Sequence, residues 1–351
     1  MTVPRDRKAT PGVAGRASAP EAARKTGCTG TDDADDGCDR PAQDAARPDR
    51  AGWLAAIEEI GEEAGYFQTV GSRHWAFFSD DSPVLLVTFE TVADIRSRTD
   101  GLPMGYALAR DHGWSSLCLI ADGETWYRDA GVYRYVDRLV DDAFFEDFDR
   151  VVFYGAGMGA YAACAYSVAA PGATVLALAP VATLDPALAG WDSRHARHRR
   201  LTFTDRYGYA PDMTEGAGDV FVVFDPAEPL DAMHAALFAR PHVTALRARR
   251  IGGAVEQALE GMQILSPLIT AACEGTLDAP LFHRMLRKRR GYGPYLDRLM
   301  DRLETTGRFA LAALAARSVL SRATSPRLTR RLAELTALGV TMPPQGRTDQ
   351  P

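Results

Sequence analysis

Short apolar runs alternate with amphipathic stretches between about residues 53 and 253. Most of these runs are continuous rather than alternating, which is typical of strands buried on both faces of a sheet. Helical spacing occurs at 53–67, 132–145 and 158–170. Strands that alternate with helices predict an α/β domain whose sheet is mostly parallel and flanked by helices. The expected strands are 73–79, 83–89, 117–122, 151–155, 173–180, 219–225 and 242–248.

Strand patterns cease after about residue 253, which divides the chain into an α/β domain at 51–253 and an all-helical C-terminal region at 254–340. The first 50 residues hold only Met1, Val3 and Val13 as large apolar side chains, so they cannot bury enough surface to offset the entropy of ordering. We expect 1–50 and 341–351 to be disordered. The expected C-terminal helices are 254–274, 279–304, 307–322 and 326–338.

The composition excludes several classes of protein. The chain has 351 residues, with 40 basic and 46 acidic side chains, and a net charge of −6 disfavours nucleic-acid binding. No apolar run approaches the roughly 18 residues of a membrane span, and the N-terminus lacks the apolar stretch of a secretory signal, which predicts a cytoplasmic protein. Only three lysines are present, and none follows a glycine as in a phosphate-binding P-loop.

Charge is distributed unevenly along the chain. Residues 281–331 carry thirteen basic and three acidic side chains, whereas residues 51–280 carry seventeen basic and thirty-two acidic ones. The basic helical region 281–331 is therefore expected to dock on the acidic domain, to form a solvated face, or to offer a surface to a partner protein.

The most informative motif is a glycine turn, Gly155-Ala156-Gly157-Met158-Gly159, between a predicted strand and a predicted helix. One chemistry for such a turn is nucleotide binding, in which glycines let the backbone approach a phosphate at the helix N-terminus. That use expects an acid at the end of the next strand. Here the strand ends Leu178-Ala179-Pro180, with no acid before Asp185, so nucleotide binding through 155–160 remains the weaker alternative.

The turn also resembles the nucleophile elbow of the α/β-hydrolase fold, Gly-x-Ser-x-Gly. Gly155 and Gly159 match the outer glycines, and Gly157 stands at the nucleophile position. The resemblance covers about residues 70–255 and implies a triad acid near Asp225 and a histidine after the strand 242–248. The residues there are Arg-Arg-Ile-Gly-Gly at 249–253. We therefore expect an α/β-hydrolase-like domain that lacks the serine and the histidine of a catalytic triad.

Four segments resemble a narrower group of bacterial α/β-hydrolase-like proteins: VTFETVADIRSR, LCLIADGETWYRD, YGAGMGAYAA and FDPAEPLDAMHA. Some members of that group are linked to surface-polysaccharide genes, and alphaproteobacterial ones often carry the name phosphoadenosine phosphosulfate reductase. The residues do not support a reductase. The Ser-Gly-Gly-Lys-Asp phosphate loop and the Glu-Cys-Gly-x-His motif of sulfonucleotide reductases are missing, and the nearest text is Ala272-Cys273-Glu274-Gly275.

Several polar residues are candidates for contact with a ligand. Asp231 and His234 lie three apart on a predicted helix after Asp225, so they share a face and are expected to pair at the surface or to meet a ligand. Glu90 ends a predicted strand, where it can meet a ligand or cap a helix at 91–98. The candidate site comprises Glu90, Gly155, Gly157, Met158, Gly159, Asp225, Asp231 and His234.

The sequence predicts a catalytically degenerate binding or scaffold module, with a small anionic ligand or a sugar as the expected partner. The enzyme alternative is a transferase, hydrolase or reductase that uses Asp225, Asp231 or His234 instead of a serine. The five cysteines form no Cys-x-x-Cys pair, so we expect no metal site, and no cofactor can be assigned from the residues.

Overall fold

The computed structural model describes residues 49–322 and 324–338. Of the two segments predicted to be disordered, 341–351 lies outside the described residues, and so does 1–50 except for its last two residues. No helix in the described ranges is long and apolar enough to cross a membrane.

Eight strands form one sheet in the order β1-β2-β4-β3-β5-β6-β7-β8. Strand β2 runs antiparallel to both of its neighbours, and the other neighbouring pairs are parallel. This order, with one antiparallel strand in second place, is that of an α/β-hydrolase sheet, so the predicted fold class is confirmed. The strands are β1 (Gly65–Thr69), β2 (His74–Ser79), β3 (Val84–Thr91), β4 (Ser115–Ala121), β5 (Arg150–Ala156), β6 (Thr174–Leu178), β7 (Asp219–Phe224) and β8 (Val243–Arg247).

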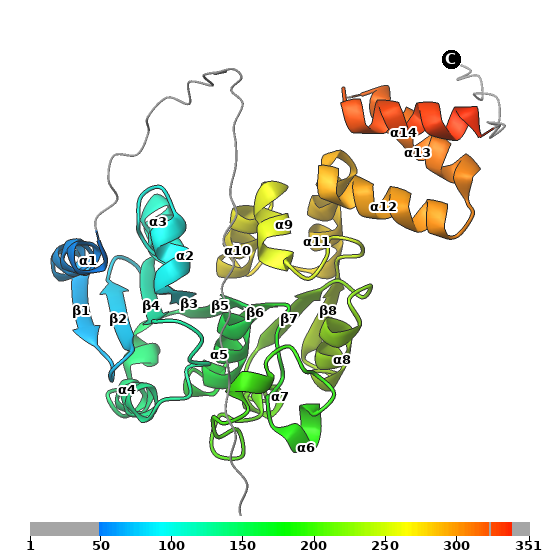
Figure 1. Ribbon diagram of the computed structural model, residues 1–351. Helices are drawn as coiled ribbons and strands as arrows, with labels where there is room; N and C mark the ends of the chain where they lie inside the picture. Colours follow the sequence, from blue (N-terminus) through cyan, green and yellow to red (C-terminus); the bar gives the residue numbers. More distant parts are fainter. Residues whose placement is uncertain (1–48, 323, 339–351) are drawn as a thin grey trace, which may run out of the picture. The chain divides into compact units, whose positions relative to one another are not determined.

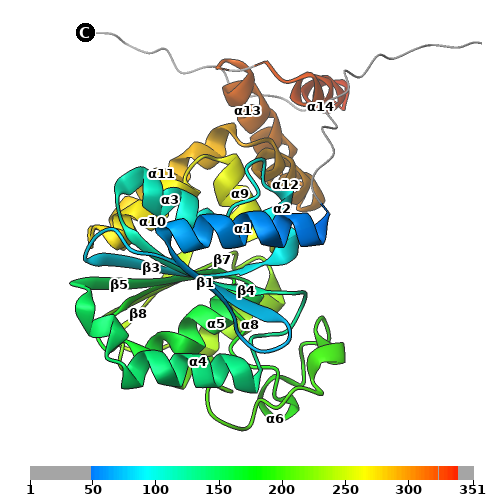
Figure 2. The ribbon, with the colours of Figure 1, turned by 90° about the vertical axis from the view of Figure 1, so that its left-hand side faces the viewer.

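Helices cover both faces of the sheet (Figures 1 and 2). One face carries α4 (Ala130–Asp141), α5 (Met158–Tyr166), α7 (Ala210–Met213) and α8 (Pro229–Leu237). The opposite face carries α1 (Arg50–Ala64), α2 (Val92–Ser97), α3 (Met104–His112), α9 (Val255–Gly261), α10 (Leu265–Cys273) and α11 (Ala279–Met285). Alternate residues of a central strand enter opposite cores: Leu85 and Val87 face the core under α5, and Leu86 faces the core under α10.

The seven predicted strands are present, but the first strand of the sheet was not expected. The helical pattern of 53–67 predicts one helix, whereas α1 ends at Ala64 and Gly65 begins β1. Tyr66 and Phe67 pair in register with Phe78 and Phe77 of β2. Aromatic residues suit a half-buried strand, and this cross-strand packing overrides the helical spacing at the end of the segment.

Two of the predicted C-terminal helices are interrupted. The segment 254–274 forms α9 and α10, which are separated where Gln263 takes a φ of 55°. The segment 279–304 forms α11, the 3-10 turn η4 (Leu286–Gly291) and α12 (Gly293–Thr305). A residue in the left-handed region cannot continue an α-helix, which explains the first interruption. The last helices are α13 (Phe309–Leu320) and α14 (Pro326–Ala337).

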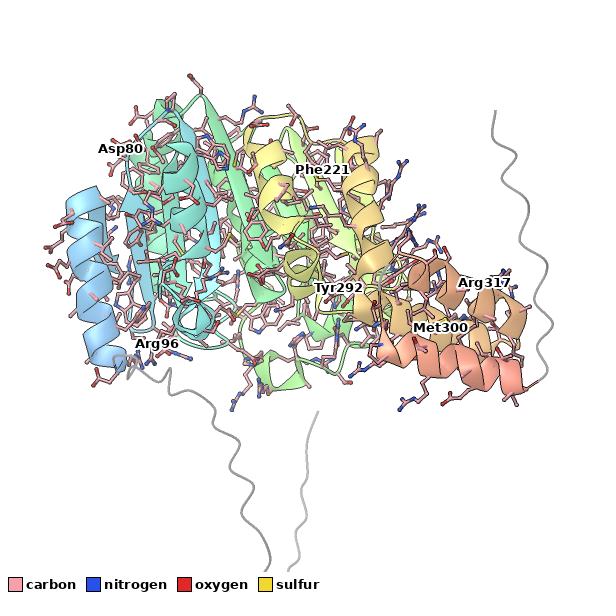
Figure 3. The ribbon with its side chains drawn as sticks, turned by 90° about the horizontal axis from the view of Figure 1, so that it is seen from above. Asp80, Arg96, Phe221, Tyr292, Met300 and Arg317 are labelled. Carbon is pink, nitrogen blue, oxygen red and sulfur yellow. The ribbon has the colours of Figure 1, made fainter. Side chains whose placement is uncertain are left out.

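Helices α12, α13 and α14 share a small core of their own, which includes Met300 (Figure 3). The three acids of the basic region are all paired with arginines of α14. Arg331 contacts Asp301 at 2.5 Å and Glu304 at 2.7 Å, and Arg327 lies 3.6 Å from Asp297. The core consists of Leu296, Met300, Ala312, Ala313, Ala316, Val319, Leu328 and Leu335.

Candidate functional site

The glycine turn is a sharp strand-to-helix elbow at the carboxyl edge of the sheet. Strand β5 ends at Ala156, Gly157 follows with φ 54° and ψ −113°, and α5 begins at Met158. The Gly157 N–H donates to the Leu178 carbonyl of the neighbouring strand at 2.9 Å. This positive φ is costly for any residue with a β-carbon, and it is the kind of strained turn that presents a nucleophile in an α/β-hydrolase.

The two outer glycines are required by close backbone contact. A β-carbon on Gly155 would lie 2.2 Å from the Gly159 carbonyl oxygen, and one on Gly159 would lie 2.4 Å from the Phe89 carbonyl oxygen of β3. Both distances are far below van der Waals contact. Helix α5 therefore lies directly against β3 and β5, as its small buried residues allow. A side chain on Gly157, by contrast, would meet nothing within 4 Å.

Met158 begins α5 and packs beside the loop that follows β4. Its sulfur accepts a hydrogen bond from the Trp126 N–H at 3.0 Å. Trp126 and Tyr127 are fully buried and both have positive φ values, of 56° and 54°. The aromatic pair therefore packs the loop against the elbow helix.

Asp225, at the position of a triad acid, braces two loops. Its side chain is fully buried. One carboxylate oxygen accepts from the Ala227 N–H at 2.9 Å, and the other accepts from the Gly252 N–H at 2.8 Å. Gly252 belongs to the loop after β8, where the hydrolase pattern expects a histidine. Both oxygens are thus used to join the end of β7 to that loop.

Glu90 caps a helix, but not the one expected from the sequence. Its carboxylate accepts from the backbone N–H groups of Met104 at 2.8 Å and Gly105 at 3.0 Å, at the N-terminus of α3. The helix at 92–97 is capped instead by Thr91, whose hydroxyl accepts from the Asp94 N–H at 3.1 Å. Backbone donors fourteen residues away carry no signal in the local sequence, so the capped helix was misassigned.

Asp231 and His234 lie on α8, but they do not pair with each other. Asp231 accepts from Arg194 at 2.6 Å, and the His234 Nε2 lies 3.0 Å from an oxygen of Asp192. Arg194 also bonds Asp192, at 2.8 Å, so one guanidinium bridges the two carboxylates. His234 and Asp192 have 0% and 1% of their surface exposed, which makes this a buried network rather than a surface pair.

The protonation states of this network are fixed by its hydrogen bonds. The His234 Nδ1 accepts from the Ala182 N–H at 3.2 Å, so the ring proton lies on Nε2 and is donated to Asp192. Burial lowers the pKa of His234 and keeps the ring neutral. Burial alone would raise the pKa of Asp192, but the hydrogen bonds from Arg194 and His234 hold it well below its usual range.

A further acid near the elbow strand was not found from the sequence. Glu256 of α9 accepts a hydrogen bond from the Tyr154 hydroxyl of β5. Burial raises the pKa of Glu256. The two residues are 102 positions apart. A single acid at the start of a helix is usually exposed to solvent, so the sequence gives no sign of this buried contact. Asp192 and Arg194 were missed for the same reason, since they lie in a polar segment that suggests a surface loop.

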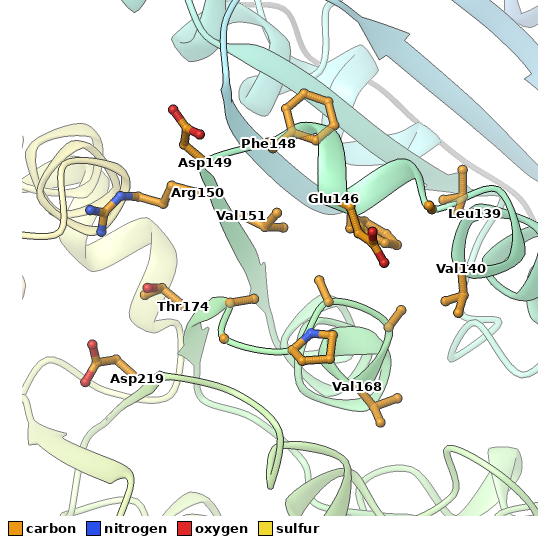
Figure 4. Close-up of a pocket in the computed structure, with 17 residues that line it drawn as sticks. Leu139, Val140, Glu146, Phe148, Asp149, Arg150, Val151, Val168, Thr174 and Asp219 are labelled. Carbon is orange, nitrogen blue, oxygen red and sulfur yellow. The ribbon is translucent and has the colours of Figure 1, made fainter.

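A pocket of about 630 Å³ opens at the opposite edge of the sheet (Figure 4). Arg150, Thr174 and Asp219, the first residues of β5, β6 and β7, line it together with Val140 and Val168. None of the residues predicted for the site lines this pocket. Within the described residues, no group of three or more His, Cys, Asp or Glu side chains is placed to hold a metal ion.

No protein-family model matches this sequence, and no curated protein matches it. Several solved structures are similar in fold. An S-formylglutathione hydrolase from Agrobacterium tumefaciens is 12% identical, covers 59% of this chain and 91% of its own, and has a TM-score of 0.40. Est1E from Butyrivibrio proteoclasticus is 15% identical, covers 60% of this chain and 98% of its own, and has a TM-score of 0.39. An esterase domain from Rhodothermus marinus is 11% identical, covers 58% of this chain and 94% of its own, and has a TM-score of 0.37. These similarities concern the fold alone.

Proposed function

We propose that this chain is a catalytically degenerate α/β-hydrolase-fold protein that acts as a binding or scaffold module. The observation that carries the proposal is the elbow itself. Gly157 holds the conformation of a nucleophile position and has no side chain to attack a carbonyl. A serine triad also needs a histidine, and residues 249–253 contain none.

The enzyme alternative has little support from the contacts of its candidate groups. General acid–base catalysis needs a group that can reach a substrate and exchange a proton. Both oxygens of Asp225 accept backbone N–H groups, and both ring nitrogens of His234 bond to protein atoms. Asp231 pairs with Arg194. Nucleotide binding through the glycine turn lacks the acid that would hold a ribose.

Fluorophosphonate labelling tests the proposal directly, because the probe reacts with a serine that a histidine activates. We expect no labelling of the natural chain and no turnover of p-nitrophenyl acetate. Gly157→Ser is expected to stay inactive, because a hydroxyl without a base keeps its ordinary pKa. Gly157→Ala is the matched control, since it introduces the same strain at a positive φ without a hydroxyl.

Stoichiometric labelling of the unmodified chain at one residue, mapped by peptide mass analysis, would overturn the proposal. Native mass spectrometry of the purified protein, with and without a metabolite extract, then identifies what the module binds. We propose a cytoplasmic location for the module.

The basic helical region 281–331 is proposed as a surface for a partner protein. Arg284, Arg287 and Arg290 of α11 and η4 are exposed and have no carboxylate partner in the part of the chain that the structure describes. Their simultaneous substitution by glutamate is expected to abolish binding to an acidic partner and to leave the fold intact. Unchanged binding would assign the contact to another surface.

A further inference from the structure

A second pocket, of about 570 Å³, opens at the carboxyl edge of the sheet. Three segments line it: the start of β2, the loop after β4, and the segment around η3 (Ala196–His198). Its volume lies within the range of about 300–1,000 Å³ that is usual for small-molecule sites. Neither Gly157 nor His234 lines it, so it is separate from the elbow and from the buried network.

His74, one of the residues that line the pocket, has a buried ring nitrogen without a partner. His74, the first residue of β2, has 1% of its surface exposed and pairs in register with Ala121 of β4. Its Nε2 lies 2.7 Å from the Thr125 hydroxyl, whereas its Nδ1 has no hydrogen-bond partner among the described residues. A buried polar atom without a partner is costly, and such atoms often mark the place of a bound group.

The hydrogen bonds around Thr125 make the Nδ1 of His74 a hydrogen-bond donor. The Thr125 oxygen accepts from the Tyr127 N–H at 3.2 Å, which leaves its hydroxyl proton free to be donated to the His74 Nε2. Burial lowers the pKa of His74 to about 4, so the ring is neutral at pH 7 and carries one proton. With Nε2 accepting from Thr125, that proton lies on Nδ1.

The charges around the pocket favour an anion. Arg73, Arg128, Arg197 and Arg200 line it, against the carboxylates of Glu124 and Asp129. Two of these arginines are already paired, Arg128 with Asp205 and Arg197 with Glu124.

The other two arginines are not held by a carboxylate, although Arg73 donates one hydrogen bond to the backbone carbonyl of Asp122. Arg73 and Arg200 have no carboxylate partner within residues 49–322 and 324–338. Both are exposed, and they come from different segments. Asp129 is engaged in capping α4, where it accepts from the Gly131 N–H at 2.6 Å. A backbone N–H does not neutralise the Asp129 carboxylate, but the two unpaired arginines outnumber it, so the pocket keeps an excess of positive charge.

We propose that this pocket binds a small phosphorylated metabolite, with the phosphoryl group held by Arg73, Arg200 and the Nδ1–H of His74. A phosphoryl group has three terminal oxygens and can accept hydrogen bonds from three directions, which matches donors on separate segments. A pocket of this volume holds more than an inorganic anion. The proposal goes beyond a non-catalytic elbow and stands independently of it, because the two sites share no residue.

Isothermal titration calorimetry with inorganic phosphate, glucose 6-phosphate and glucose tests the proposal at constant ionic strength. We expect saturable binding of phosphate, tighter binding of glucose 6-phosphate, and no heat from glucose. Arg73→Gln and Arg200→Gln are each expected to weaken phosphate binding about tenfold, since each removes one charge-assisted contact. Both side chains are exposed, so the variants are expected to keep the unfolding temperature of the natural chain.

The matched control is Arg302→Gln, which makes the same charge change at an exposed position of α12 outside the pocket. We expect it to leave phosphate binding unchanged. Three results would overturn the proposal: no saturable binding of either phosphate compound, unchanged affinity in both pocket variants, or an equal loss in Arg302→Gln. The last result would show diffuse attraction to a basic surface. None of these outcomes bears on fluorophosphonate labelling, so the two proposals fail separately.

Discussion

The elbow at 155–159 and the buried network around His234 each contain a different part of what an enzymatic site requires. The elbow has the backbone geometry of a nucleophile turn. Gly157 has a positive φ, and the glycines on either side let the helix lie in close contact with two strands. The network has side chains of the types that catalysis uses: a histidine beside an aspartate and an arginine. Yet both nitrogens of its histidine bond to protein atoms.

Residue type and geometry are therefore separate requirements for catalysis. At the elbow, a reacting group is missing where there is room for one. In the network, the reacting groups are present but have no room to act, because an imidazole that accepts from Ala182 and donates to Asp192 has no free nitrogen.

Breaking the buried network is expected to destabilise the fold more than any other change considered below. Asp192→Ala leaves the buried Nε2–H of His234 without its acceptor, and it removes one of the two carboxylates that bind Arg194, whose side chain is 37% exposed. Removing one partner of a buried charged network typically costs about 3–5 kcal/mol, and we expect that loss in the free energy of unfolding measured with urea.

Asp212→Ala is the control for that experiment, since Asp212 pairs with Arg240 at the surface with 52% of its side chain exposed. Surface pairs contribute roughly 0–1 kcal/mol, so the control is expected to lose no more than that. Equal losses in the two variants would mean that the network is solvated and that His234 is accessible after all.

The next effect concerns the elbow. Gly159→Val places a branched side chain against the Phe89 carbonyl, which a β-carbon alone would already approach to 2.4 Å. We expect destabilisation by roughly 2–4 kcal/mol through overpacking and backbone strain, measured by chemical unfolding. Gly216→Val is the matched control, because a β-carbon at Gly216 meets nothing within 4 Å and its φ is not positive. A similar loss in both would show that the turn is not tight.

A smaller effect is expected from pH. Burial lowers the pKa of His234 in the folded chain from its ordinary value of 6.5. The unfolded chain therefore binds a proton at a higher pH than the folded one, and the stability from the neutral ring is present above pH 6.5 and lost as pH falls below it. In His234→Gln, the amide can accept from Ala182 and donate to Asp192 without titrating. We expect unfolding curves of this variant to depend less on pH between 6.5 and 5 than those of the natural chain. An identical dependence in the two proteins would contradict a buried neutral ring.

The smallest effect is expected at Cys273, the cysteine nearest to the position a sulfonucleotide reductase would use. It is 2% exposed at the end of α10, and burial raises its pKa to about 12. A thiol in that state is neither a nucleophile nor accessible. We expect the natural chain to release no sulfite in a thioredoxin-dependent assay, and we expect Cys273→Ser to leave that result unchanged. Sulfite release that the substitution abolishes would restore the reductase hypothesis.

The sequence was sufficient for the central strands and the elbow, because continuous apolar runs and closely spaced glycines are local signals. It was insufficient for contacts between distant segments. Asp192 lies 42 residues from His234, and only the fold brings the pair together. β1 was read as the end of a helix because its pairing with β2 is a tertiary effect. Of the two roles expected for Glu90, contact with a ligand or a cap for 91–98, the structure shows a cap, but on α3, because its partners come fourteen positions later.

The sheet ends in two outer strands, β1 and β8, of five residues each. An outer strand presents unpaired backbone groups to any other strand it meets, so a long flat one invites fibrillar association of unrelated chains. Here β8 ends at Arg247, and Arg249 and Arg250 come shortly after it. Two copies that paired these edges in parallel would bring these like charges together. The short outer strands and the charge repulsion at the end of β8 therefore favour a protein that stays dispersed at high concentration, and neither feature involves the core.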